Sequence, residues 1–194
     1  QFWYPDGTII VVAQSIGFRI YKGLLAEASE MFHDMFNNAS PSPPPSQAER
    51  SVTPSDGCPV VRVSDTAAEI RSLLNVLLHG RQYMHGRDLD FEDLANCIRL
   101  THKYRMQDIY EALMGELKKI FPEDFATWEE HASRWLDYPH TDAIVAVGLA
   151  HLTDTPSILP ISLYLCCQLE GAALIGGRAR VDGAVDNLSM DDLI

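Results

Sequence analysis

Cysteine is scarce in this chain, and its spacing indicates neither a disulfide framework nor a zinc site. The four cysteines are Cys58, Cys97, Cys166 and Cys167, and none forms the paired C-x-x-C spacing of structural zinc sites. We expect the adjacent pair to pack as small hydrophobes. Free thiols persist in reducing compartments, so the sequence predicts a cytoplasmic or nuclear protein.

Positive charge is also in short supply. Lysine and arginine total 15 against 27 acidic residues, which gives a formal net charge of −12. Nucleic-acid binding needs clustered basic side chains. The densest basic group, Arg99, Lys103 and Arg105, has the spacing of a solvated helix face. We therefore expect no nucleic-acid partner.

Long uninterrupted apolar runs are missing. The most apolar stretch, 158–175, contains Pro160, Gln168 and Glu170, whereas a membrane-spanning helix needs about 20 nearly uncharged residues. We expect no membrane partner. Apolar residues still make up 46% of the chain, which is typical of a protein with a buried core. Its 194 residues suit one domain plus a smaller helical appendage.

Patterns that carry catalysis or bind metals are missing as well. No two of the seven histidines have the i, i+4 spacing of an H-E-x-x-H site, and no serine lies in a G-x-S-x-G turn. The glycines before Arg178 lack the Lys-Ser/Thr pair of a phosphate loop. The carboxylates of Asp88, Asp90, Glu92 and Asp93 are better explained as a helix start. We predict no catalytic, cofactor-binding or metal-binding residues and no small-molecule substrate.

What is present is an ordered series of secondary-structure signals. Apolar and β-branched runs over 8–14 and 17–21 predict a hairpin, and apolar residues over 24–36 recur at helical spacing. A third strand is predicted over 60–64. Helices with apolar stripes follow over 66–80, 88–104 and 109–121. Thr66 and Glu69 have the spacing of a capping box, and Gly80 fits a helix end.

Two further regions are less regular. Six of the eleven prolines lie within 37–59, which excludes regular structure there. We interpret this segment as a surface loop, and the alternative is a Pro-rich ligand for an aromatic groove. Helices are predicted over 125–135, 142–152 and 156–170, with Trp128 and Trp135 as anchors of the first. The start at Gln1 and a helix start at 189–193 lead us to expect an excerpt of a longer protein.

The stretch from Phe18 to Phe36 resembles the core signature of BTB/POZ domains. The family pattern is an aspartate before the first strand, then F-x-x-H-[KR]-x-x-L-x-x-x-S-x-x-F-x-x-[ML]-F. The matching residues here are Asp6, Phe18, Lys22, Leu25, Ser29, Phe32, Met35 and Phe36. Tyr21 departs from the pattern, because the family usually has histidine there. Residues 100–104 resemble the family's L-x-x-A-x-x-Y region, and 56–61 with the Pro-rich insert are most similar to BTB-domain proteins of mushroom-forming fungi.

The resemblance implies a particular architecture. We expect an α+β protein with a BTB/POZ-like fold over residues 6–121, in which a small sheet of about three strands packs on five or more helices. The Pro/Ser-rich segment 37–59 would be a loop insertion in this domain. Residues 122–194 would form a helical C-terminal extension.

The resemblance also implies a protein–protein interaction module without catalysis. Its partner would be a second copy, as a homodimer, or another BTB protein, with Leu24, Met31 and Met35 as contact residues. Asp6 and Lys22 would form a charged pair at a pocket near the dimer interface, or else a surface ion pair worth at most about 1 kcal/mol. Ser29 is expected within a helix, bonded back to a carbonyl or simply small at a tight contact.

Two alternatives remain open at this point. The chain could be the substrate-recruiting adaptor of a cullin-type ubiquitin ligase, or the oligomerisation domain of a transcriptional regulator whose DNA-binding module lies elsewhere. Adaptors of the first kind often carry a hydrophobic-x-Glu motif soon after the M-F pair. Residues 37–41, which occupy that place, lack it. Cullin docking is therefore the weaker interpretation.

Overall fold

A three-stranded sheet forms one end of the molecule. The computed structural model describes residues 2–38, 57–85, 89–130 and 140–193. Strands β1 (Ile9–Ala13) and β2 (Ile16–Ile20) form an antiparallel hairpin, and β3 (Val60–Val63) returns parallel to β1, which gives the order β2-β1-β3. All three predicted strands are confirmed. Every residue of β1 is buried, as expected for a central strand covered on both faces.

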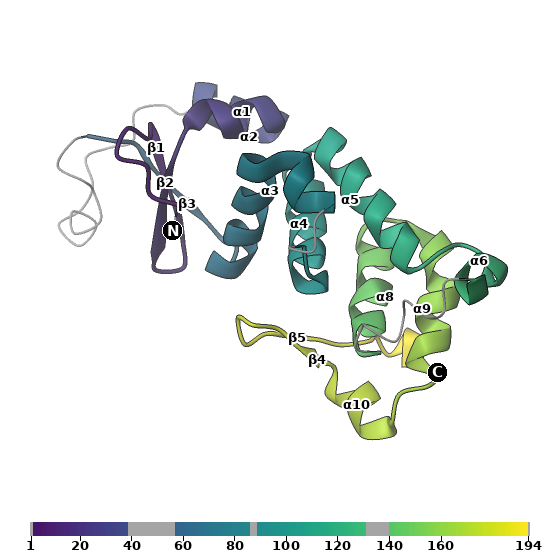
Figure 1. Ribbon diagram of the computed structural model, residues 1–194. Helices are drawn as coiled ribbons and strands as arrows, with labels where there is room; N and C mark the ends of the chain where they lie inside the picture. Colours follow the sequence, from purple (N-terminus) through teal and green to yellow (C-terminus); the bar gives the residue numbers. More distant parts are fainter. Residues whose placement is uncertain (1, 39–56, 86–88, 131–139, 194) are drawn as a thin grey trace.

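A helix pair and three longer helices follow the first strands. The pair is α1 (Lys22–Ala28) and α2 (Glu30–Asn38), and it lies beside the sheet in Figure 1. After β3 come α3 (Ala67–His85), α4 (Phe91–Lys103) and α5 (Gln107–Ile120). The predicted capping box begins α3, because the Thr66 N–H donates to Glu69 Oε2 (2.9 Å) and the Glu69 N–H donates to Thr66 Oγ1 (3.2 Å). Gly80 interrupts the helical path of α3 with φ 59°.

The C-terminal part begins with a series of helices. Helices α6 (Phe125–Glu130) and α8 (Asp142–Leu152) lead through a 3₁₀ turn (Pro156–Ile158) to α9 (Leu159–Cys166). The helix predicted over 156–170 therefore ends four residues early. Trp135, the second predicted anchor, lies outside the described residues.

The rest of the C-terminal part was not anticipated from the sequence. A short helix, α10 (Gly171–Gly176), precedes a small antiparallel hairpin of β4 (Arg178–Ala179) and β5 (Val185–Asp186). The helix start predicted at 189–193 is a 3₁₀ turn over Asp191–Leu193. Figure 1 shows the hairpin reaching back beneath α3 and α4.

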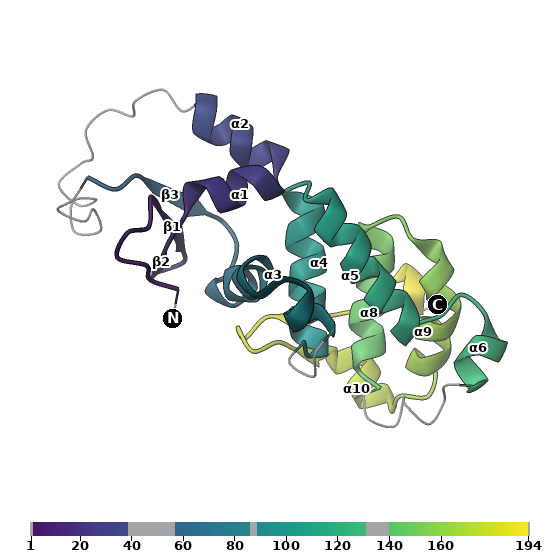
Figure 2. The same cartoon turned by 45° about the horizontal axis from the view of Figure 1, so that its top comes forward.

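Helix α4 takes part in two hydrophobic cores. Its C-terminal end, with Leu100 and Tyr104, packs with the sheet and with α1, α2 and α3. Its earlier residues, among them Leu94 and Ile98, pack with α5, α8 and α9. The predicted extension therefore shares a continuous core with the predicted domain, and Figure 2 shows α8 and α9 lying beside α5.

The α+β class predicted from the sequence is confirmed by this mixture of a small sheet and many helices. Within the ranges that the structure describes, no helix combines the length and the apolar character that crossing a bilayer requires.

Candidate interaction surface

The loop before β1 is tied to the start of α1 through Tyr21 and Asp6. The Tyr21 hydroxyl donates to both carboxylate oxygens of Asp6, at 2.9 and 3.0 Å. This hydrogen bond raises the pKa of Tyr21 above its ordinary value. Tyr21 is the residue that departs from the family pattern, and its long side chain reaches the aspartate that the pattern places before the first strand. The sequence pattern marks Tyr21 as a departure and indicates no role for it.

The charged pair predicted between Asp6 and Lys22 is wrong. No ion pair joins these two residues, both of which the structure describes. The Lys22 ammonium lies over the Phe36 ring, 5.4 Å from its centroid, and 3.4 Å from the Phe36 carbonyl oxygen, to which it donates. Lys22 therefore fastens α2 to the start of α1, while Asp6 is occupied by Tyr21.

Ser29 has a different place from the one predicted. It lies between α1 and α2 with extended backbone angles, so it is not within a helix. Its Oγ accepts the Phe32 N–H at 3.1 Å, which caps the start of α2, and donates to the Tyr104 carbonyl oxygen at 2.5 Å. One hydroxyl thus joins the helix pair to the end of α4, 75 residues away.

The two segments that carry the family resemblance meet at this point. The Phe32 ring stacks on the Tyr104 ring with centroids 4.4 Å apart, and both side chains are buried. The Tyr104 hydroxyl donates to Asp65, which also pairs with Lys103 at 2.5 Å. Burial and the hydrogen bond to Asp65 raise the pKa of Tyr104. The match at 18–36 and the match at 100–104 therefore belong to one packed unit.

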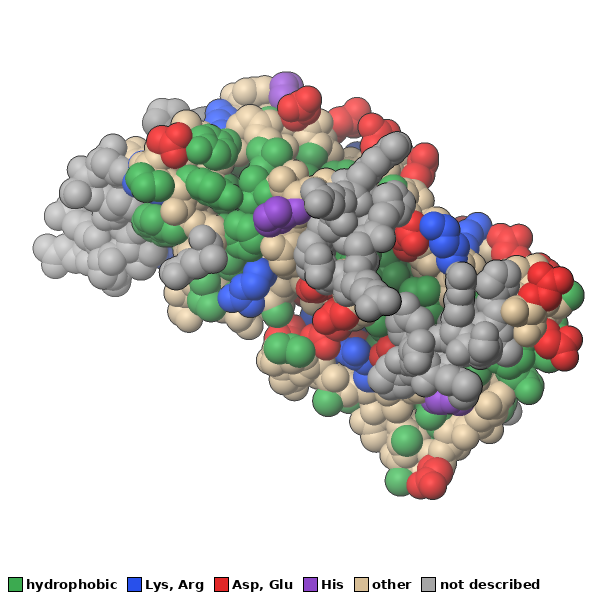
Figure 3. All heavy atoms as spheres, in the orientation of Figure 1, with side chains coloured by type: hydrophobic (Ala, Val, Ile, Leu, Met, Phe, Trp, Pro, Cys, Tyr) green, Lys and Arg blue, Asp and Glu red, His purple; other side chains and the backbone are tan. Residues whose placement is uncertain are grey.

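Helix α2 exposes two methionines among polar side chains. Met31 and Met35 are one helical turn apart and are 44% and 36% exposed, whereas Phe32 on the inner face is 1% exposed. Trp3, Ile16 and Tyr21 add further exposed apolar side chains next to the sheet. In Figure 3, hydrophobic side chains gather over the half of the molecule that holds the sheet. Two of the three predicted contact residues thus remain open to a partner.

Leu24, the third predicted contact, occupies another position. It is half-buried and lines a groove of about 930 Å³ between the helix pair and the junction of α4 and α5. The groove is also lined by Glu27, Ala28, Glu30, Leu77, Thr101, His102, Arg105, Gln107, Asp108, Ile109 and Tyr110. Its lining mixes charged and apolar side chains, so the groove is a separate surface from the one that carries Met31 and Met35.

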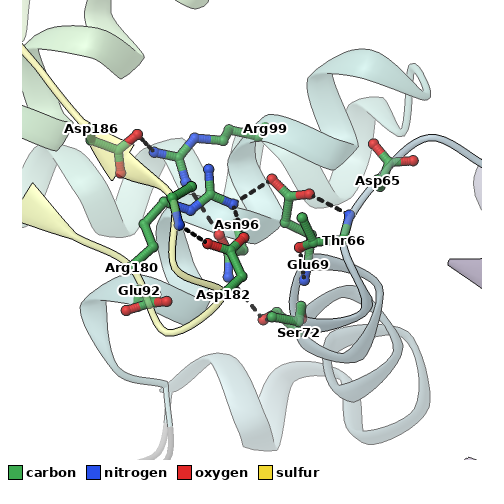
Figure 4. A network of polar contacts seen from close by, with 12 residues as sticks. Asp65, Thr66, Glu69, Ser72, Glu92, Asn96, Arg99, Arg180, Asp182 and Asp186 are labelled. Atoms are coloured by element: carbon green, nitrogen blue, oxygen red, sulfur yellow. Dashed lines mark hydrogen bonds and ion pairs between the residues drawn. The ribbon is translucent and has the colours of Figure 1, made fainter. Parts of the chain in front are cut away.

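The hairpin of β4 and β5 is fastened by ion pairs. Arg178 pairs with Glu92 and Asp142, Arg180 pairs with Glu69, and Arg99 pairs with Asp186 at 2.9 Å. Figure 4 shows the part of this network around Arg99 and Arg180. The expectation that Arg99 lies on a solvated face is wrong, because its side chain is only 17% exposed. Its partner lies 87 residues away, so no local pattern could have indicated the pair.

The other polar clusters are structural or isolated. The predicted helix start is confirmed at Asp90, whose side chain accepts the Asp93 N–H and caps α4 at 2.7 Å, while Asp88 lies outside the described residues. In the described ranges, no three His, Cys, Asp or Glu side chains lie close enough to hold a metal ion.

The adjacent cysteines lie in different environments. Burial raises the pKa of Cys166 to about 11, whereas Cys167 is exposed, contrary to the expectation that both would pack.

A scan against models of known protein families finds no match, and a search of curated proteins finds no related protein.

Proposed function

We propose that this chain is a BTB/POZ-like interaction module that associates with a second copy of itself through the exposed face of α2. The observation that carries the proposal is the contact between Phe32 and Tyr104, which packs the two family-like segments against each other. The order of strands and helices and the parallel return of β3 beside β1 are consistent with it. The proposal includes no catalytic step and no cofactor.

The apolar side chains of α2 support this choice of surface. The side chains of Met31 and Met35 are exposed to solvent although they lie close to the buried core. Methionine side chains are flexible, so they can pack against surfaces of different shape. A second copy can cover this face by two-fold symmetry, because such an interface uses the same residues twice. Glu27, Glu30 and Asp34 lie on the same helix pair and would form the polar rim of the interface.

Sedimentation velocity at tens of micromolar chain tests the proposal. We expect a dimer for the wild-type chain and a monomer for the double variant Met31→Glu/Met35→Glu, because two buried carboxylates per copy would face each other. Moderate salt is needed, since two copies with a formal charge of −12 each repel one another.

The matched control is Met190→Glu, which places the same change at a methionine that is 72% exposed and lies in the C-terminal part. It should remain dimeric. A monomeric wild-type chain, or a double variant as dimeric as the control, contradicts the proposal.

A second proposal is an adaptor for a cullin-type ubiquitin ligase. One observation favours it: α8 and α9 continue the core of α4 and α5, so the extension offers a rigid helical support beside the domain. The place of the adaptor motif, 37–41, extends beyond the described residues after Asn38. A pull-down with purified cullin that recovers no complex would remove this proposal and leave the first intact.

A further inference from the structure

The last segment of the described chain is held on its neighbours mainly by polar contacts. Residues 171–193, which we name the C-terminal strap, contain no buried residue in the structure. Leu174 and Leu188 reach the core as partly buried side chains, whereas Ile175 and Val181 are 77% and 85% exposed. The strap therefore differs from α8 and α9, which contribute buried side chains to a core.

The first point of attachment is Arg178, which bridges two helices. Its Nε donates to Asp142 Oδ1 on α8 at 2.7 Å, and its Nη1 donates to Glu92 Oε2 on α4 at 3.0 Å. Asp142 is 3% exposed, and burial raises its pKa despite the arginine beside it. An ionised carboxylate in such a buried place is stabilised by a cation, and the guanidinium of Arg178 reaches Asp142 and Glu92 together.

The second point of attachment is Arg180, two residues further along the strap. Its Nη2 donates to Glu69 Oε1 on α3 at 2.7 Å (Figure 4). Side chains two apart lie on the same face of an extended segment. Arg178 and Arg180 thus contact carboxylates on three helices, α3, α4 and α8.

Glu92 also recognises the backbone of the strap. Its Oε1 accepts the Val181 N–H at 2.7 Å while its Oε2 accepts from Arg178. One carboxylate therefore accepts from an arginine and from the backbone N–H three residues further along, and the second bond does not depend on the side chain at that position.

The fit of the strap is incomplete. Among the described residues, the Nε of Arg180 and the Oδ2 of Asp186 are buried and have no hydrogen-bond partner. Buried polar atoms without partners destabilise the arrangement that contains them.

We propose that Glu69, Glu92 and Asp142 form a docking site for an Arg-x-Arg segment of a partner protein, and that the strap occupies this site in cis. This inference does not depend on the surface proposed for self-association. A tethered strap acts at an effective concentration in the millimolar range, so a partner segment enters only where the strap is displaced.

A fluorescein-labelled peptide of residues 177–187, Gly177 to Asn187, tests the site by anisotropy. The full chain with Arg178→Gln/Arg180→Gln keeps the carboxylates and weakens the strap, so it should bind the peptide at least about tenfold more tightly than the wild-type chain does. Adding Glu92→Gln to this variant should abolish binding, whereas adding Glu129→Gln, an exposed glutamate on α6, should not.

A matched peptide with glutamine at both arginine positions should not bind. If the folded strap variant, with a cooperative melting transition, binds neither peptide, or binds both equally, the site does not recognise arginine and the proposal fails. Arg62→Gln, at an exposed position on β3, is the control for removing an arginine outside the strap. It should leave peptide binding as it is in the wild-type chain.

A second measurement uses the wild-type chain alone. Raising NaCl from about 0.1 M to about 1 M shortens the screening length from about 10 Å to about 3 Å. Because the ion pairs of the strap are largely buried, salt screens them only weakly, and amide hydrogen exchange in the strap should be faster than in α8 and α9 at both salt concentrations. If the strap keeps the same protection as α8 at both salt concentrations, it is an integral part of the core and not a displaceable occupant.

Discussion

Ser29 connects two parts of the chain through a single oxygen atom. Replacing it with alanine removes the cap of α2 and the hydrogen bond to the Tyr104 carbonyl together. We expect Ser29→Ala to lower the free energy of unfolding by about 1–3 kcal/mol, because a helix cap and a buried hydrogen bond are both lost. Urea denaturation measures this loss. Ser15→Ala, in the exposed turn between β1 and β2, should change it by less than about 0.5 kcal/mol, and equal losses in the two variants would contradict the assignment.

Side-chain contacts between residues close in the sequence could be predicted, whereas contacts between distant residues could not. The Thr66–Glu69 box and the Asp90 cap involve partners three residues apart, so their spacing alone predicts them. Ser29 was placed wrongly because helical spacing continues across the break between α1 and α2, and the pattern does not show where a backbone turns. Asp6 binds Tyr21 because the Tyr21 side chain is long enough to reach it, and Lys22 binds the Phe36 carbonyl because α2 places that group nearby. Neither relation is visible in the sequence.

Helices α3 and α8 each contain a glycine. Replacing these glycines with alanine should change the free energy of unfolding in opposite directions. Gly80 has a positive φ of 59°, which L-residues rarely adopt, whereas no positive φ occurs at Gly148 within α8; neither position has a neighbouring atom within 4 Å of an added Cβ. We expect Gly80→Ala to destabilise the chain by about 1 kcal/mol and Gly148→Ala to stabilise it by up to about 1 kcal/mol. Thermal unfolding checks the signs, and a gain in both variants would show that α3 tolerates a continuous helix.

The strap should loosen in acid. Burial alone would raise the pKa of Asp182, but the Ala184 N–H and Arg180 hold it below its ordinary value. The pKa of Asp192 is lowered in the same way by Ser189 and His151. A carboxylate with a lower pKa in the folded chain stabilises the fold above that pKa and loses this effect as pH falls through it.

Both pKa values lie below the ordinary aspartate value of about 3.9, so the loss should occur below about pH 4. Amide exchange in the strap, corrected for the intrinsic effect of pH, should rise there before exchange in α8 does. Uniform loss of protection across the chain would contradict an element that detaches by itself.

The strap was also the element least accessible to sequence analysis. Its hairpin strands have two residues each, too few for a period-two pattern, and several of its apolar residues, among them Ile175, Val181 and Val185, are exposed. Its arginines find partners 86 and 111 residues away, and a sequence shows no sign of such pairs. By contrast, the long helices carry apolar stripes that identify them directly.

For the whole molecule, the shared core predicts a single unfolding transition. Ile144 on α8 is 1% exposed and packs in the core that also contains Leu94 and Ile98 of α4. We expect Ile144→Ala to destabilise the chain by about 2–5 kcal/mol and to lower the melting temperature of both halves together. Leu152→Ala, at a position 47% exposed, should have a much smaller effect. Two separate calorimetric transitions would show that the C-terminal part folds independently.

Helix α4 is a rigid rod about 20 Å long that joins two distant surfaces. Its last turn is anchored to the methionine-bearing helix through Tyr104, and its first turn holds the strap through Glu92. The C-terminal end of α4 also packs with the sheet through Leu100 and Tyr104. One helix therefore holds the sheet, the helix pair and the strap in fixed positions relative to one another.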